Sequence, residues 1–421
     1  MASNGKATNG NAQTTPNRQP SKPDLKFREP FTWDLTYAFL CRTAFHPLAL
    51  LVYPALVYLL DKRSSGTPSI YPSPSFTLLR ELLSPSSTNS YKWIGRLFWF
   101  TLIKNINNAL TRYARNHGEW RRDRPDWKKD VVVITGGAAG IGKACVEVLS
   151  HEKRAKVAVL DLGVPTYAPA PAGAPEILYF KVDVTDTAAV KEVADQIRKR
   201  YGEPSILINC AGIASGSTIF DTELKNLEKV WRVNTLSNYV TAQEFVPHMV
   251  KQNHGHILTV ASSASYMCLP QMGEYATSKS AALAFHEVLH GELKARYFAP
   301  KVRASICCPT KVRTSLGDGM EDHNMPFLTP NLMPIQVGRA MVNALDSGLS
   351  HYIIMPQFMR ILPWMRSVPD WIKRIVQILG HTDSTVNNAS LGRALKNGYG
   401  SDWTDDLKAS REKVLKSLSG K

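Results

Sequence analysis

The chain has 421 residues, more than one ordinary α/β domain of about 250 residues needs, so it carries additional segments. Its 51 Lys and Arg residues outnumber 35 Asp and Glu, and the formal net charge of +16 indicates an anionic partner, either a nucleic acid or a membrane surface. The six cysteines lack the paired spacing of a zinc cluster, so we interpret them as reduced thiols in a cytosol-facing protein.

Residues 1–30 are polar and contain few large apolar side chains, which predicts a disordered leader. The segment 31–126 is predicted to be a membrane-anchor and basic linker region. Within it, residues 44–60 form an uncharged run of 17 residues, and as a helix this run is about 26 Å long. A membrane core is about 30 Å thick, and Pro54 would bend the helix. Three alternatives follow: a spanning helix, a bent insertion into one leaflet, or a buried core helix.

A second apolar stretch, residues 93–103, is rich in aromatic side chains of the kind found at membrane interfaces. Residues 104–129 then carry eight Lys and Arg against three acids. A basic block after an apolar anchor is typical of the cytoplasmic side and attracts anionic lipid. This placement of the charge favours a membrane over a nucleic acid, so no nucleic-acid partner is predicted. The Ser- and Pro-rich residues 61–90 are predicted to form a flexible loop.

A glycine-rich turn marks the start of a nucleotide site. Residues 130–135 are mostly β-branched and predict a buried parallel strand, and residues 141–149 have helical spacing. Gly136, Gly140 and Gly142 lie between these two segments. Free backbone N–H groups and the helix dipole at such a turn bind a pyrophosphate, and glycine allows its close approach.

A second predicted strand, residues 156–161, ends in a carboxylate about 20 residues after the glycine turn, where an acid accepts the adenosine ribose hydroxyls. Asp161 would repel a 2′-phosphate, so NAD is favoured and NADP is the alternative. Prolines in residues 162–176 exclude a helix there and predict a more open adenine side. Two further strands are predicted at residues 179–183 and 205–209.

Ser262, Tyr275 and Lys279, further along the chain, are candidates for proton transfer. Tyr275 and Lys279 are four residues apart, so they share one face of a helix. A phenol ordinarily titrates near pH 10, and a neighbouring ammonium favours the phenolate, which predicts a lowered pKa for Tyr275. Ser262 ends an apolar strand pattern, where its hydroxyl would hydrogen-bond a substrate oxygen as its charge changes.

The motifs of roughly residues 129–320 and their order along the chain resemble those of the short-chain dehydrogenase/reductase family. The resemblance implies a Rossmann-type, doubly wound parallel α/β sheet with helices on both faces. It implies that Tyr275 is the general acid/base, that Lys279 lowers its pKa and holds the nicotinamide ribose, that Ser262 orients the substrate oxygen, and that Asn234 supports a water-linked proton path. The implied cofactor contacts are Gly136, Gly140, Ile141, Gly142, Asp161, Asp183, Val184, Asn209, Ala211, Gly212, Tyr275, Lys279, Pro309, Val312 and Thr314.

The sequence departs from the family pattern in three places, the first being the proline-rich residues 162–176 where the family has a helix. Cys210 replaces the usual second Asn after Asn209, which predicts the loss of a hydrogen bond at the sheet edge. Thr310 replaces a glycine, which predicts a stiffer loop before the nicotinamide contacts. The block 253–263 is similar to the membrane-anchored retinol and lipid-droplet hydroxysteroid dehydrogenases. Its two histidines have no third ligand nearby, so no metal site is predicted.

The catalytic domain is predicted to span residues 127–358, with its last strand at 351–355 and a mobile lid at 320–330. A C-terminal helical extension is predicted for residues 359–421. Its first part, 359–380, is apolar, aromatic and basic, which indicates either membrane-lying helices at the mouth of the site or a packed cover of the core. A surface helix is predicted at residues 405–418.

These features predict a membrane-associated oxidoreductase that exchanges a hydride between a nicotinamide cofactor and a retinoid, steroid or long-chain lipid. The endoplasmic reticulum or lipid droplets would hold it, with the catalytic domain facing the cytosol. A homodimer through residues 221–250 and 273–297 is expected from the family. The alternative is a lipid-surface binding or scaffold protein that keeps the fold without catalysis.

Overall fold

The computed structural model describes residues 25, 27, 29–65 and 92–386. Most of the predicted leader and most of the predicted loop 61–90 therefore lie outside the described residues, as does the helix predicted at 405–418. Of the leader's described residues, Leu25 packs against the core of the sheet, and Arg339 donates a hydrogen bond to its carbonyl at 2.9 Å.

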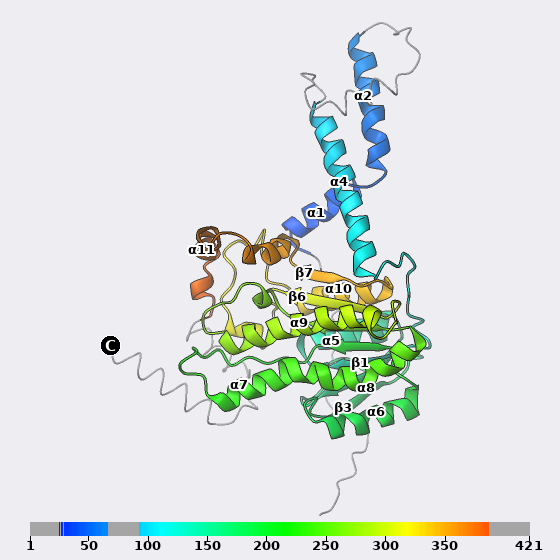
Figure 1. Ribbon diagram of the computed structural model, residues 1–421, viewed down its shortest axis with the longest axis vertical. Coiled ribbons are helices and arrows are strands. Elements are labelled where there is room, and N and C mark those ends of the chain that lie inside the picture. The colour runs from blue at the N-terminus through cyan, green and yellow to red at the C-terminus, as the bar shows by residue number, and fades with distance from the viewer. Residues whose placement is uncertain (1–24, 26, 28, 66–91, 387–421) are drawn as a thin grey trace, which may run out of the picture. The chain divides into compact units, whose positions relative to one another are not determined.

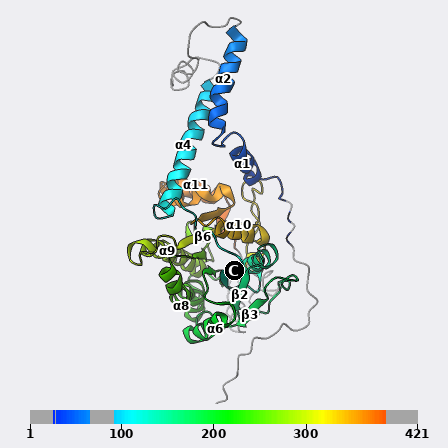
Figure 2. The same cartoon turned by 90° about the vertical axis from the view of Figure 1, so that its right-hand side faces the viewer.

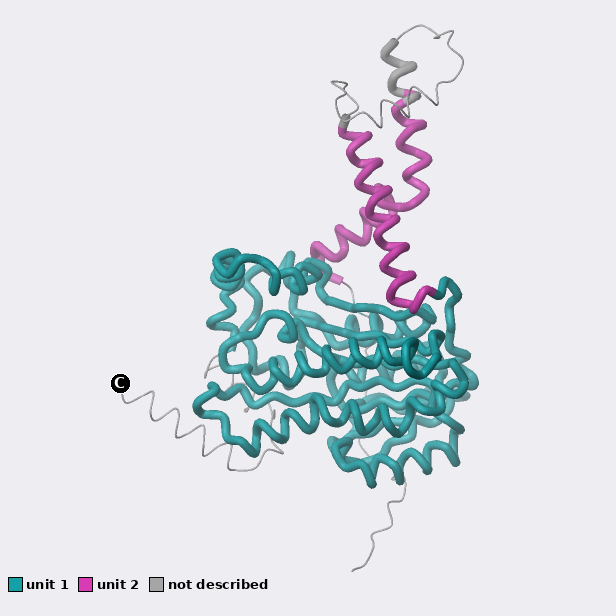
Figure 3. Tube along the Cα trace, in the orientation of Figure 1, with its two compact units in different colours: residues 1–28, 119–421 teal, residues 29–118 magenta. Residues whose placement is uncertain are grey.

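The chain divides into two compact units (Figure 3). One consists of residues 29–118, and the other consists of residues 1–28 and 119–421. The residues of each unit contact mainly other residues of the same unit. The functional boundaries predicted after residues 126 and 358 remain predictions.

The unit of residues 29–118 is helical. Its helices are α1 (Trp33–Arg42), α2 (Ala49–Ser65) and α4 (Lys92–Arg115), so α2 extends into the predicted loop. The loop before α2 is tied to α4, because the Thr101 hydroxyl donates to the carbonyl of Ala44 and the Asn105 amide to that of Phe45. Along the described parts of the chain, no helix is both long enough and apolar enough to cross a membrane.

The second unit is built on a seven-stranded sheet with the order β3-β2-β1-β4-β5-β6-β7, in which every neighbouring pair is parallel. The strands are β1 (Val131–Thr135), β2 (Lys156–Asp161), β3 (Ile177–Lys181), β4 (Ile206–Asn209), β5 (His256–Val260), β6 (Arg303–Pro309) and β7 (Tyr352–Met355). Chain order reverses between β1 and β4, where α/β sheets bind their ligands. The prediction of a Rossmann-type doubly wound sheet is confirmed.

Two helical layers cover the sheet, and Figures 1 and 2 show them on opposite faces. Successive strand side chains alternate between the layers. Val131 and Val133 pack in a core with α6, α8 and α9, whereas Val132 and Ile134 pack in a core with α5 and α10. The helices of this unit are α5 (Gly140–Glu147), α6 (Thr187–Tyr201), α7 (Leu224–Trp231), α8 (Ser237–Gln252), α9 (Gly273–Ala295), α10 (Pro334–Asp346) and α11 (Asp370–Leu379).

Short 3-10 and π segments complete the fold. The chain around Ser262 turns in a 3-10 segment, η3 (Ser263–Ser265), and the extension begins with another, η5 (Gln357–Arg366). A π turn, η2 (Arg232–Leu236), joins α7 to α8. As the prolines predicted, residues 162–176 contain no helix.

His254 joins the segment before β1 to the loop before β5. Its Nδ1 lies 2.7 Å from Asp123 Oδ2, and its Nε2 lies 3.1 Å from Asp130 Oδ1. These hydrogen bonds, the one with Asp123 first, raise the pKa of His254 to about 10. Burial acts to raise the pKa of Asp130, but the bonds with His254 and Ser205 lower it. His254 is thus ion-paired, and its neighbour His256 is separately buried against the Ser305 hydroxyl.

Replacing His254 by Asn should reduce the free energy of unfolding at pH 7 by about 2 kcal/mol. This magnitude is discounted for solvent screening, because the His254 side chain is 36 % exposed. The folded-state pKa of the histidine lies above its unfolded value. The additional free energy of unfolding of the wild type is therefore fully present below about pH 6.5, and it is lost as the pH rises through about 10. Denaturant titrations from pH 5.5 to 10.5 measure this difference, and a difference that does not change with pH would contradict the ion pair.

Candidate active site

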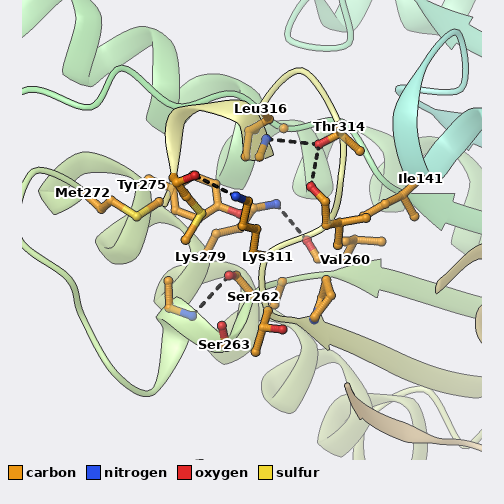
Figure 4. A pocket seen from close by; sticks show the side chains of 18 of the residues that line it. Ile141, Val260, Ser262, Ser263, Met272, Tyr275, Lys279, Lys311, Thr314 and Leu316 are labelled. Carbon is orange, nitrogen blue, oxygen red and sulfur yellow. Dashed lines mark hydrogen bonds between the residues drawn. The ribbon is translucent and has the colours of Figure 1, made fainter. Parts of the chain in front are cut away.

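A cavity of about 830 Å³ opens at the carboxyl ends of β1, β2, β4, β5 and β6. This is the edge at which parallel α/β sheets bind their ligands, and the volume suits a large organic molecule. Figure 4 shows part of its lining, to which Ile141, Ser262, Tyr275, Lys279 and Thr314 contribute.

The glycine turn forms the floor of one half of the cavity. Gly136 and Gly140 have φ angles of +67° and +58°, a region that favours glycine. A Cβ on Gly136 would lie 2.7 Å from the Cα of Ala211, and one on Gly142 would lie 2.1 Å from the carbonyl oxygen of Gly136. No side chain caps the N-terminus of α5, so its first N–H groups are available to a phosphate. These residues fit a dinucleotide.

Asp161 lies at the end of β2 on the cavity lining. Its Oδ2 accepts a hydrogen bond from the Ala138 N–H and its Oδ1 accepts one from the Gly163 N–H, both at 2.8 Å. Asp183 and Val184 line the same side. The carboxylate is therefore held in place at the position expected for the adenosine ribose.

Residues 162–176 are held by hydrogen bonds, and the more open adenine side stays a prediction. The N–H and hydroxyl of Thr166 both donate to the carbonyl of Ala138, at 3.1 and 2.9 Å. The N–H of Ala168 donates to Oε1 of the buried Glu147 on α5 at 3.2 Å. The proline-rich segment is therefore bonded to the glycine turn and to the helix that follows it.

The end of β4 is held by side-chain hydrogen bonds from two directions. The Thr135 hydroxyl accepts hydrogen bonds from the backbone N–H groups of Cys210 and Ala211, and the loss expected from the side chain of Cys210 stays a prediction. Asn209, a predicted cofactor contact, is buried outside the cavity lining. Its Oδ1 accepts from the Thr241 hydroxyl of α8 at 2.9 Å, because its side chain packs beneath the sheet edge rather than above it.

Asn234 also lies outside the cavity lining. Its Oδ1 accepts from the N–H of Ile213 at 2.8 Å, and its Nδ2 donates to the carbonyl of Ile213 and to the Ser278 hydroxyl. These bonds fix the segment after Gly212 against α9. Asn234 thus positions the backbone of Ile213, and its part in a water-linked proton path stays a prediction.

Ser262, Tyr275 and Lys279 lie together on the cavity lining, as the sequence predicts (Figure 4). Ser262 follows β5, and its Oγ accepts a hydrogen bond from the Ala264 N–H at 3.1 Å, which caps η3. Tyr275 and Lys279 are one turn apart on α9, and both are buried. The Lys279 Nζ donates to the carbonyl of Val260 at 2.8 Å and lies 5.9 Å from the centre of the Tyr275 ring.

The charge state of this group differs from the prediction. Burial raises the pKa of Tyr275 to about 12, although the hydrogen bond with Ser262 acts to lower it. Burial also lowers the pKa of Lys279 to about 8. The expected lowering of the phenol pKa by Lys279 is not found, because the ammonium is itself desolvated and is directed at the Val260 carbonyl. At neutral pH the phenol therefore keeps its proton.

The remaining residues predicted to contact the cofactor lie on the cavity lining. Ile141, Ala211 and Gly212 line the cavity, as do Pro309, Val312 and Thr314 after β6. Thr310, where the family has glycine, donates its N–H to the carbonyl of Met355 and lines the cavity.

The sequence did not single out three side chains that hold the site together. Oε1 of the buried Glu274 accepts from both N–H and hydroxyl of Ser215, at 2.8 and 2.6 Å. Lys311 donates to Asp322 of the lid segment at 2.6 Å. Arg366 of η5 donates to the carbonyl of Ser265, next to the catalytic serine, at 2.7 Å. Glu274 and Lys311 adjoin motif residues, whereas no local pattern marks Arg366.

The half of the cavity beyond Ser262 is mostly apolar. The predicted lid and the C-terminal extension both contribute to it, so the extension covers the core at the mouth of the site. The apolar lining residues are Met267, Leu269, Met272, Leu316, Met320, Met325, Leu328, Phe358, Met359, Ile361, Leu362, Met365, Val376 and Leu379. Thioether side chains adapt readily to greasy ligands of different shapes.

Comparison with known proteins identifies the class. A family model described as short chain dehydrogenase matches residues 130–324. Dehydrogenase RED2 of Cochliobolus heterostrophus is 40 % identical over 184 residues, which cover 44 % of this chain and 68 % of the relative. Estradiol 17-beta-dehydrogenase 11 of Pongo abelii is 30 % identical over 275 residues, or 63 % and 87 % of the two chains. Epidermal retinol dehydrogenase 2 of Mus musculus is 31 % identical over 246 residues, or 57 % and 78 %.

The chain belongs to the short-chain dehydrogenase/reductase family, and it resembles the retinol and hydroxysteroid dehydrogenases within it. It is an NAD(P)-dependent oxidoreductase that acts on CH–OH groups. Both conclusions confirm what the sequence predicts.

Replacing Gly142 by Ala should abolish nucleotide binding and destabilise the fold, because the new methyl group would overlap the Gly136 carbonyl. Gly291→Ala is the matched control, since nothing lies within 4 Å of a Cβ there and the residue is inside α9. The control should gain about 0.5–1 kcal/mol of stability and keep its nucleotide affinity. Calorimetric titration with NAD and thermal melts check both, and normal NAD binding by Gly142→Ala would contradict the assignment of the turn.

Proposed function

We propose that the protein is a membrane-associated dehydrogenase that interconverts a lipophilic alcohol with its ketone or aldehyde. The observation that carries the proposal is one cavity with two halves. Ser262, Tyr275 and Lys279 lie where a glycine turn and a strand-end carboxylate fit a dinucleotide, and the other half is apolar. A retinoid, steroid or long-chain lipid fits such a lining.

When bound, the nicotinamide cofactor accepts a hydride from the alcohol carbon or donates one to the carbonyl carbon. The Ser262 hydroxyl holds the substrate oxygen next to the Tyr275 phenol. In the oxidation, the phenolate of Tyr275 takes the hydroxyl proton. In the reduction, the neutral phenol gives its proton to the oxygen. The Lys279 ammonium donates to the Val260 carbonyl and lies 5.9 Å from the centre of the Tyr275 ring, so it places positive charge beside the phenol without lowering the phenol pKa in the cofactor-free site.

The substrate class rests on the lining and on the relatives. Two of the relatives are named for estradiol and for retinol, both apolar molecules with a hydroxyl group. The methionine-rich side of the cavity suits such rings and chains. The scaffold alternative is not favoured, since the proton-transfer residues are complete and the relatives are dehydrogenases.

We propose NAD as the preferred cofactor. The Asp161 carboxylate is fixed by two backbone N–H groups at the adenosine end of the cavity, where it would repel a 2′-phosphate.

Association with a membrane or lipid-droplet surface is supported by the unit of residues 29–118. The apolar side chains Leu48, Leu51, Leu59 and Ile103 are exposed there. The basic block that follows them suits anionic lipid on the cytosolic face of the endoplasmic reticulum or of lipid droplets. A homodimer through α7, α8 and α9 is part of the same proposal.

Replacing Tyr275 by Phe should lower kcat for a long-chain or steroid alcohol by about 10²–10⁴-fold, because proton transfer loses its acid/base. The dissociation constant for NAD should stay within about threefold, since the substitution removes one hydroxyl and leaves the glycine turn intact. Steady-state kinetics and titration with NAD measure the two quantities. Turnover that survives the substitution would overturn the assignment of Tyr275.

The pH dependence separates this role from a structural one. Oxidation needs the phenolate, and the phenol pKa is raised to about 12 in the cofactor-free site, so wild-type kcat/KM for oxidation should rise from pH 6 to 10. Reduction uses the neutral phenol and should change little below pH 9. The residual activity of Tyr275→Phe should have no such slope. A flat wild-type profile for oxidation would count against the mechanism.

Replacing Asp161 by Asn should lower the ratio of kcat/KM with NAD to kcat/KM with NADP about tenfold, since removing the charge removes about 1.4 kcal/mol of discrimination. The amide oxygen of Asn can still accept from the Ala138 N–H of the glycine turn, whereas the Gly163 N–H loses its acceptor. Asp183→Asn is the control. Its carboxylate accepts from Thr185 and should leave the ratio within about twofold. An unchanged ratio in Asp161→Asn would remove the preference for NAD.

A further inference from the structure

The outward face of α11 is apolar, which reverses the usual pattern of a surface helix. Trp371, Ile375, Ile378 and Leu379 follow the i, i+4, i+7, i+8 spacing of one helix face, and all four are exposed. Trp371 is 66 % exposed and Leu379 is 64 % exposed. A contiguous apolar face that is exposed to solvent is typical of a binding site for another molecule or a membrane.

The segment before α11 extends this face. Ile361 and Trp364 of η5 are exposed, Trp364 by 74 %, while their neighbours Leu362 and Met365 are buried in a core with Tyr266. Arg366 is bonded to the Ser265 carbonyl. The backbone of η5 is therefore fixed on the catalytic unit. Ile361 and Trp364 are exposed although the segment that carries them is packed.

This face is continuous with the substrate half of the cavity. Ile361 and Leu379 belong both to the exposed surface and to the cavity lining, and Val376 lines the cavity from the adjoining side of α11. The apolar lining of the cavity therefore adjoins the exposed apolar face of η5 and α11. Figure 1 shows α11 beside η5 at one end of the catalytic unit.

The charges around the face favour an anionic lipid surface as its occupant. Arg360, Arg366, Lys373 and Arg374 lie on η5 and α11, against Asp370 on these segments and Asp383 just after them. Arg374 is paired with Asp383 at 2.8 Å, which leaves an excess of positive charge. Tryptophan side chains prefer the boundary between lipid headgroups and acyl chains, and basic side chains attract anionic headgroups.

We propose that this surface, defined as Ile361, Trp364, Trp371, Ile375, Ile378 and Leu379, lies in the headgroup boundary of an anionic membrane. The cavity then takes its lipophilic substrate directly from the lipid phase. This port surface is a membrane contact of the catalytic unit itself, additional to the anchor of residues 29–118. The inference rests on the proposed function, because it concerns how the substrate of that site arrives.

The test uses the full-length chain and the variants Ile375→Glu and Ile378→Glu. Each protein is assayed with a long-chain alcohol held in phosphatidylcholine/phosphatidylserine vesicles and with a short, water-soluble alcohol. Gln377→Glu is the matched control, since it adds the same charge to α11 outside the apolar face. We expect kcat/KM for the vesicle-borne alcohol to fall at least tenfold in the two variants. With the soluble alcohol it should change less than twofold, and the control should keep both activities.

An equal loss of kcat/KM on both substrates, or no loss on either, would contradict the proposal that the substrate enters from the membrane across the port surface. Equal losses together with dissociation of a dimer would show that a second copy covers the face, and equal losses in a monomer that melts earlier would show that another part of this chain does.

A second measurement does not depend on turnover. Brominated phospholipids quench tryptophan fluorescence on contact, so vesicles that contain them should quench wild type more than Trp364→Phe or Trp371→Phe. Identical fractional quenching in all three proteins would exclude the contact. If the wild type oxidises neither alcohol, the proposed function fails, and the quenching still decides whether the face meets lipid.

Discussion

Exclusion of water at the end of β5 is the constraint on which the site depends. Tyr275 and Lys279 are almost completely buried, and burial raises the pKa of the phenol to about 12 and lowers the pKa of the ammonium to about 8. The Val260 carbonyl offers the ammonium its hydrogen bond, and the Ser262 hydroxyl offers one to the phenol. A charge that develops on the substrate oxygen in this place meets fixed dipoles instead of mobile water, which is the condition for electrostatic catalysis.

Much of the fold could be predicted because its signals are local. The β-branched run at 130–135 and the glycine turn after it are read over a few residues, and they gave the parallel sheet and the nucleotide half of the cavity. The absence of a helix in 162–176 follows directly from its prolines. Tyr275 and Lys279 share a helix face by spacing alone, so their place on one cavity was also predictable.

What could not be predicted depends on contacts between distant segments. A family motif places Asn209 near the cofactor, but only the packing of α8 shows that Thr241 takes its carboxamide. The Thr135 hydroxyl accepts from the backbone N–H of Cys210, a contact between residues 75 positions apart that no local pattern marks. The protonation of Tyr275 depends on burial, which spacing does not reveal, so the cation next to it suggested the wrong direction for its pKa.

The bond that Ser262 makes to the backbone has a consequence for which ligands the cavity selects. A serine hydroxyl has one proton to give and two lone pairs. One lone pair is committed to the Ala264 N–H and the hydroxyl faces the Tyr275 phenol, so its one proton is shared between the phenol and a ligand oxygen that comes between them. A ligand is then recognised at this point by an oxygen with electron density to offer, such as an alkoxide or carbonyl.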